Sequence, residues 1–284
     1  MELPESRLYA FVDQSREFAL HFLEGQRLIR DLAMTHSICG EGFAYFRDVV
    51  LSVQPTIALL KQGEQFGFYV DSDAPFFRLK IEAGHHGVTR CALFPDAFRE
   101  FPPAMRGLVR VVKVFPRNRP PYQSVLEIDG LPLGEIVNRV LRDSYQVNAA
   151  IIVSQQSDQS LLLLQLPPLA GAGDYDYSPD ALAARRDGLL RPLERLFGRA
   201  LSGKAGIVRG FASIGFELLA HKPIRFRCSC SHERMVGNLR LACGNQYGEL
   251  FDPDQQALAI TCEYCKSQYS VTRDDLRRAA VRLN

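Results

Sequence analysis

Apolar and polar positions alternate with two different periods along the first part of the chain, which predicts both strands and helices there. Apolar residues recur at helical spacing through 42–62, where Pro55 is expected to split the helix, and again through 133–144. Turn-forming residues at 71–75 and 83–87 separate neighbouring strand candidates, which favours antiparallel hairpins. Strands are predicted at 7–12, 65–70, 76–82, 88–94, 107–114, 122–128, 149–154 and 161–164.

The order of these elements predicts the fold class. Helices do not alternate regularly with strands, so the pattern indicates an α+β fold with an antiparallel sheet rather than a doubly wound parallel one. A cluster of Pro, Gly, Asp and Tyr at 167–177 interrupts the pattern, and Ser178 with Pro179 then favours the start of a helix. We therefore expect an N-terminal α+β domain at 1–170, a helical linker at 171–222 and a small cysteine-bearing module at 223–284.

Charge is distributed unevenly along the chain. The 284 residues carry a formal net charge of only +2, which does not favour a strongly nucleic-acid-binding protein. Residues 178–227, however, hold ten Lys or Arg and four Asp or Glu, a net charge of +6. Apolar residues interspersed among these charges, together with several glycines, indicate a packed or partner-facing helical segment of low intrinsic stability.

Motifs for membrane insertion, targeting and catalysis bear on the location and activity of the protein. No apolar run is long enough to span a membrane, and residues 1–5 do not begin a signal peptide, so we expect a cytoplasmic protein without membrane association. Thiols are usually reduced in the cytosol, so the seven cysteines point to metal or redox chemistry rather than a disulfide framework. No phosphate-binding loop, nucleophile elbow or metallopeptidase motif is present, and we do not expect an enzyme.

Four cysteines near the C-terminus form two closely spaced pairs. Cys228 and Cys230 make a C-x-C motif, and Cys262 and Cys265 make a C-x-x-C motif 31 residues later. Four thiolates suit a tetrahedral zinc ion, and a purely structural zinc site is one interpretation. A second interpretation is a removable zinc, because a disulfide within C-x-C closes a strained ring, and strained disulfides are typically the regulatory ones. Oxidation of such a site would unfold a small module whose stability depends on the metal.

These motifs resemble the 33-kilodalton heat-shock chaperonin family, which comprises redox-regulated holdase chaperones of the bacterial cytosol. The mark of that family is C-x-C followed at about this distance by C-x-x-C near the C-terminus. Segments 226–231 and 262–265, with Tyr269, are similar to its two half-motifs. Segments 66–82 and 121–144 resemble parts of its N-terminal region.

The resemblance implies an ATP-independent chaperone that binds unfolding client proteins under oxidative stress and heat shock. The reduced protein would hold one zinc ion through Cys228, Cys230, Cys262 and Cys265 and be inactive. Oxidation would form the disulfides Cys228–Cys230 and Cys262–Cys265, release zinc, destabilise the linker, expose apolar surface and yield a homodimer. The family's linker is usually acidic, whereas this one is net positive, and Cys243 lies between the two pairs as a thiol that could mispair.

Two other functions remain open from the residues alone. A zinc-ribbon nucleic-acid-binding protein would use the basic stretch 178–227 and would bind RNA or DNA in a strongly salt-dependent way. A thiol oxidoreductase would use Cys262 and Cys265, although the strand-then-helix context that lowers a thiol pKa is not predicted there. His232 is a minor candidate as a replacement zinc ligand, and Cys91 is expected to be a buried free thiol.

Overall fold

The computed structural model describes residues 3–36, 38, 40–74, 76–94, 105–117, 119–168, 176–198 and 201–282. The chain divides into two compact units, Met1–Phe226 and Arg227–Asn284. Both contain helices and antiparallel strands, so the predicted α+β class is confirmed. Among the described residues, every helix is too short or too polar to cross a bilayer.

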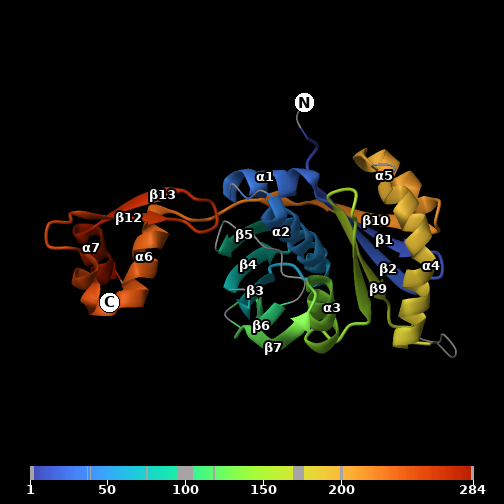
Figure 1. Ribbon diagram of the computed structural model, residues 1–284, viewed down its shortest axis with the longest axis horizontal. Helices are drawn as coiled ribbons and strands as arrows, with labels where there is room; N and C mark the ends of the chain where they lie inside the picture. Colours follow the sequence, from blue (N-terminus) through green and yellow to red (C-terminus); the bar gives the residue numbers. More distant parts are fainter. Residues whose placement is uncertain are drawn as a thin grey trace. The chain divides into compact units, whose positions relative to one another are not determined.

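A five-stranded antiparallel sheet brings the two ends of the first unit together. Its strand order is β10-β1-β2-β9-β8, so a strand that follows both linker helices pairs with the first strand of the chain (Figure 1). Its strands are β1 (Arg7–Asp13), β2 (Phe18–Glu24), β8 (Ala149–Val153), β9 (Gln159–Gln165) and β10 (Phe216–Pro223).

A second, six-stranded sheet has the order β11-β5-β4-β3-β6-β7. All of its pairings are antiparallel except that of β11 with β5. The predicted hairpin of β3 and β4 is present, but its turn is shorter than the expected 71–75, because β3 continues to Ala74 and Asp73 pairs with Phe76. The strands are β3 (Gln65–Ala74), β4 (Phe76–Gly84), β5 (Val88–Phe94), β6 (Met105–Val114), β7 (Tyr122–Leu131) and β11 (Arg225–Phe226).

The main apolar core lies between the two sheets, where helices fill the space (Figure 1). Val49 and Val50 of α2 and Leu141 of α3 are fully or almost fully buried in it. Pro55 ends the α-helical geometry as predicted, because it starts a separate 3-10 helix. The elements are α1 (Gln26–His36), α2 (Gly40–Val53), η1 (Gln54–Leu59) and α3 (Leu133–Asp143).

Helices α4 (Pro179–Gly198) and α5 (Gly203–Ala212) lie over the opposite face of the five-stranded sheet (Figure 1). The Ser178 hydroxyl accepts a hydrogen bond from the Ala181 N–H at 3.2 Å, as expected of a helix N-cap. The segment expected as a helical linker thus also contains strand β10 and buries apolar residues. This second core joins sheet and helix residues: Tyr9, Phe11, Phe18, Leu20, Phe22, Leu161, Leu163 and Phe216 with Leu182, Leu189, Leu193, Leu196, Phe197, Ile207 and Phe211.

The chain leaves the first unit through a close backbone crossing. Gly87 has φ of 82°, and a Cβ there would lie 2.0 Å from the carbonyl oxygen of Pro223. Its carbonyl also accepts a hydrogen bond from the Arg225 N–H at 2.9 Å. The positive φ and the lack of space for a Cβ both require glycine here, where the end of β10 passes the β4–β5 turn four residues before Arg227.

The second unit has only a small apolar core. Val236, Phe251, Val271 and Leu276 are its buried cluster within the described residues. A core of this size contributes little stability, so such a unit gains from a metal or another cross-link. Its elements are α6 (His232–Cys243), the 3-10 helix η2 (Gly244–Leu250), β12 (Ala257–Thr261), β13 (Gln268–Thr272) and α7 (Arg273–Arg282).

Candidate metal centre

The second unit brings four sulfur atoms together. The Sγ atoms of Cys228, Cys230, Cys262 and Cys265 all lie within 4.8 Å of one another. The Sγ atoms of Cys228 and Cys262 are 3.7 Å apart, and those of Cys230 and Cys265 are 3.2 Å apart. Tetrahedral zinc with Zn–S bonds of ~2.3 Å places its sulfurs about 3.8 Å apart, so this donor set fits zinc in chemistry and in size.

Two short segments position these thiols. Cys228 and Cys230 follow β11 and directly precede α6, where the Ser231 hydroxyl accepts a hydrogen bond from the Arg234 N–H at 3.3 Å as the helix N-cap. Cys262 and Cys265 lie in the tight turn between β12 and β13. That turn is closed by two backbone hydrogen bonds of 2.9 Å, from Cys262 N–H to the Ser267 carbonyl and from Lys266 N–H to the Cys262 carbonyl.

The thiols have unequal acidities when no cation is bound. Burial raises the pKa of Cys228, Cys230 and Cys262, because a thiolate is poorly solvated there. Burial also acts on Cys265, but hydrogen bonds with the side chain and backbone of Ser267 outweigh it and lower its pKa to about 7. A cation is therefore needed to hold all four as thiolates at neutral pH.

Hydrogen-bonding groups next to the sulfurs help to hold the cysteine side chains in position as possible metal ligands. The Tyr269 hydroxyl lies 3.0 Å from the Cys230 sulfur, and this hydrogen bond raises the pKa of Tyr269 to about 12. The Arg234 guanidinium donates to the Ser229 carbonyl at 2.9 Å and bridges the first cysteine pair to α6. Hydrogen-bonding partners of this kind orient metal ligands.

The remaining candidate residues lie elsewhere. His232 lies 3.1 Å from the Ser270 carbonyl and 3.4 Å from the Asp275 carboxylate, and the candidate metal-ligand group among the described residues contains only cysteines. Cys243 ends α6, outside the four-sulfur group. Cys91 is a buried free thiol in the first unit, as predicted, and burial raises its pKa to about 12, which disfavours the reactive thiolate.

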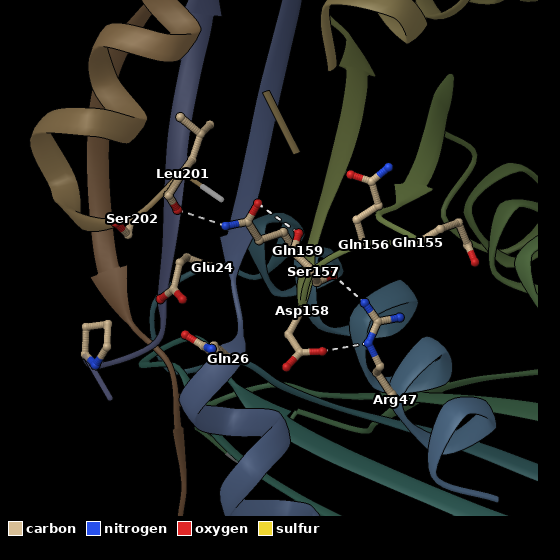
Figure 2. A pocket seen from close by; sticks show the side chains of 11 residues that line it. Glu24, Gln26, Arg47, Gln155, Gln156, Ser157, Asp158, Gln159, Leu201 and Ser202 are labelled. Carbon is tan, nitrogen blue, oxygen red and sulfur yellow. Dashed lines mark hydrogen bonds and ion pairs between the residues drawn. The ribbon is translucent and has the colours of Figure 1, made fainter. Parts of the chain in front are cut away.

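A polar pocket that the sequence did not predict lies in the first unit. It has a volume of about 380 Å³ and is lined by the β8–β9 turn, the start of α1 and the connection from α4 to α5 (Figure 2). Arg47 donates to the Asp158 carboxylate at 2.6 Å, and the Gln159 amide donates to the Leu201 carbonyl at 2.9 Å. The Gln159 hydrogen bond links the segment between α4 and α5 to strand β9 of the five-stranded sheet. No local motif marks this pocket, since its lining comes from segments that are far apart in sequence.

Glu24 is the unusual titratable group of this pocket. Burial raises the pKa of Glu24 to about 7, the Gln26 backbone N–H opposes this shift, and the charge of Asp158 adds to it. The folded protein therefore binds a proton at Glu24 under mildly acidic conditions where an unfolded chain would have lost it.

Comparison with known proteins identifies the family. A family model described as Hsp33 protein matches residues 6–272. A 33 kDa chaperonin from Pelobacter propionicus is 23% identical over 240 residues, covering 78% of this chain and 77% of that protein. A 33 kDa chaperonin from Picosynechococcus sp. is 26% identical over 249 residues, covering 80% of each.

The fold agrees with this assignment. The crystal structure of a 33 kDa chaperonin (heat shock protein 33 homolog) from Thermotoga maritima superimposes with a TM-score of 0.70 over 97% of each chain, at 12% identity. Because the family model spans nearly the whole sequence, the chain belongs to the Hsp33 family.

Proposed function

We propose that this protein is a redox-regulated, ATP-independent holdase chaperone that binds unfolding proteins during oxidative stress and heat shock. The names of its relatives support a chaperone role rather than an enzymatic one. In the reduced state, Cys228, Cys230, Cys262 and Cys265 hold one zinc ion and the protein is inactive. The observation that carries the proposal is the group of four sulfurs at zinc-compatible spacing in a unit with a small apolar core.

Oxidation of the four thiolates is the proposed trigger. Formation of each disulfide removes two electrons from two thiolates, and one hypochlorous acid molecule accepts these electrons together with one proton from solvent to give chloride and water. Two disulfides therefore consume two oxidant molecules and leave no thiolate to hold zinc. The proposed pairs are Cys228–Cys230 and Cys262–Cys265, on the strength of the family resemblance. All four sulfurs are mutually close, and the contacts Cys228–Cys262 and Cys230–Cys265 make the crossed pairing the alternative to test.

Loss of the metal is proposed to unfold the C-terminal unit, because metal-binding free energy is folding free energy in so small a module. The linker, residues 171–222, then loses stability in turn. It is intrinsically weak, since α4 contains Gly188 and Pro192 in its interior, and three of the ten residues of α5 are the glycines Gly203, Gly206 and Gly210.

The surface beneath the linker helices is the proposed client-binding surface. Phe11 and Phe22 of the sheet are fully buried, and each packs against Phe211 of α5 with the rings tilted and their centroids 4.7 and 4.9 Å apart. Removal of α4 and α5 would expose a continuous aromatic and aliphatic sheet face, of the kind that binds unfolded chains. We further propose that the oxidised protein is a homodimer and that it acts in the cytoplasm.

Zinc release and holdase activity can be measured in one reaction. The zinc-loaded, reduced protein is treated with stoichiometric hypochlorite, while a chromogenic chelator reports free zinc and light scattering reports aggregation of thermally unfolding citrate synthase. We expect release of one zinc per chain together with suppression of aggregation, and neither in the untreated sample. Cys243→Ser serves as the matched control, since that cysteine is outside the sulfur group. Retention of zinc by an oxidised protein that suppresses no aggregation would refute the proposal.

A further inference from the structure

One arginine of the basic segment, the half-buried Arg185 of α4, contacts the sheet beneath that helix. The guanidinium carbon of Arg185 is 5.4 Å from the ring centroid of Phe18 and 5.4 Å from that of Phe216. Both rings are buried, with exposed fractions of 6% and 2%. A guanidinium held over aromatic rings gains a favourable cation–π interaction while it shields them from water.

The same guanidinium reaches a buried carboxylate. Arg185 Nη2 lies 3.5 Å from Asp13 Oδ2, and the Asp13 side chain is only 5% exposed. Asp13 is fixed independently of α4, because its carboxylate accepts hydrogen bonds from the Glu17 N–H at 2.9 Å, the Phe18 N–H at 3.2 Å and the Ser15 hydroxyl at 2.9 Å. The β1–β2 turn thus offers a preformed anionic partner to α4.

We propose that Arg185 is the positioning residue that locks α4 onto the five-stranded sheet and so sets how readily the apolar surface beneath it opens. The inference rests on the proposed function and refines its regulation. It also gives a role to the positive charge of the linker, since the segment 178–227 supplies the arginine and the first sheet supplies the acid.

The lock has features that suit a reversible contact. Arg185 Nε is buried without a hydrogen-bond acceptor among the described residues, so docking leaves one donor unsatisfied and limits the net stabilisation. When α4 leaves, water hydrates the arginine, and Asp13 keeps its three hydrogen bonds within the turn. Opening would expose the rings of Phe18 and Phe216, which belong to the proposed client-binding surface.

Amide hydrogen exchange of α4 in the reduced, zinc-loaded, full-length protein tests the lock directly. We expect Arg185→Met to speed exchange of residues 182–197 by about tenfold, which corresponds to ~1.4 kcal/mol, and Arg185→Lys by a smaller factor because it keeps the charge but not the planar stacking group. Arg186→Met is the matched control, because Arg186 pairs with Asp187 at 3.0 Å and its side chain is 44% exposed. This control is expected to change exchange less than twofold.

A double-mutant cycle separates the lock from general destabilisation. Asp13→Asn retains the Oδ1 acceptor of the turn but removes the charge facing Arg185, so the double variant should exchange no more than about threefold faster than Arg185→Met alone. Multiplicative effects of the two substitutions, or equal exchange in Arg185→Met and Arg186→Met, would overturn the inference. Faster α4 exchange without an increase in aggregation suppression would support the lock and count against the proposed function instead.

Discussion

Replacement of Phe211 by alanine should make the reduced protein a chaperone without any oxidant. Phe211 is fully buried between α5 and the sheet, and its ring contacts Phe11 and Phe22 at centroid distances of 4.7 and 4.9 Å. Truncation of a buried phenylalanine costs about 3–5 kcal/mol. The ring is exposed once α5 has left the sheet, so this cost falls on the docked state alone. At ~1.4 kcal/mol per tenfold, the opening equilibrium shifts by about a hundredfold to a few thousandfold.

The assay is suppression of citrate synthase aggregation by reduced, zinc-loaded protein, with zinc content measured on the same sample. Phe77→Ala is the matched control, because Phe77 is equally buried but packs in the main core against Tyr45, with ring centroids 5.4 Å apart. We expect both variants to lose comparable global stability and only Phe211→Ala to gain activity. Equal activity of the two variants would refute the reasoning, since general destabilisation would then explain the result.

Three further outcomes are expected. Cys265→Ser should abolish stoichiometric zinc binding, whereas Cys243→Ser should leave it unchanged, as measured by elemental analysis of purified protein. Peptide mapping of the oxidised protein under non-reducing conditions should recover a Cys228–Cys230 disulfide, and a crossed link between the two cysteine pairs would contradict the proposed pairing. Because the folded pKa of Glu24 is raised to about 7, its stabilising effect is complete below the unfolded pKa near 4.5 and is lost as pH rises through about 7. Urea unfolding at pH 5 and pH 8 should therefore show a smaller pH-dependent loss for Glu24→Gln than for the wild type, and an identical loss would contradict this assignment.

Local sequence signals predicted the features whose causes are local. Pro55 ends a helix through its fixed ring, and Ser178 caps one through its hydroxyl, so both could be identified from neighbouring residues. The two cysteine pairs were recognisable because each chelating pair lies within four residues of chain. The structure brings all four sulfurs together, and metal binding by them stays a prediction.

Strand β2 and helix α1 were not predicted. Six of the seven residues of β2 are buried, because helices cover both faces of its sheet. Its apolar residues therefore form a nearly continuous run, and such a run does not distinguish a strand from a buried helix. Helix α1 follows Gly25 directly. The Gly25 N–H donates a hydrogen bond to the Asp158 carbonyl at 2.8 Å, and no local pattern indicates this contact.

Two further features were not predicted because they depend on contacts between residues far apart in sequence. Strand β10 pairs with β1 across more than 200 residues, and Arg185 meets Asp13 across 172 residues. Neither contact follows from composition or periodicity, because each depends on how complete elements pack. The linker consequently looked like a weak, basic helical segment in sequence, whereas in the structure it covers an aromatic sheet face.

Hydrogen exchange before and after oxidation tests the central claim most directly, namely that chemistry at the four cysteines uncovers the sheet beneath α4 and α5. The reduced, zinc-loaded protein and the hypochlorite-treated protein are compared by mass spectrometry of proteolytic peptides. The account predicts that residues 179–212 and 227–282 lose protection on oxidation, while β3, β4 and β6 keep theirs. Unchanged protection of 179–212 in an oxidised sample that has released its zinc and suppresses aggregation would contradict it.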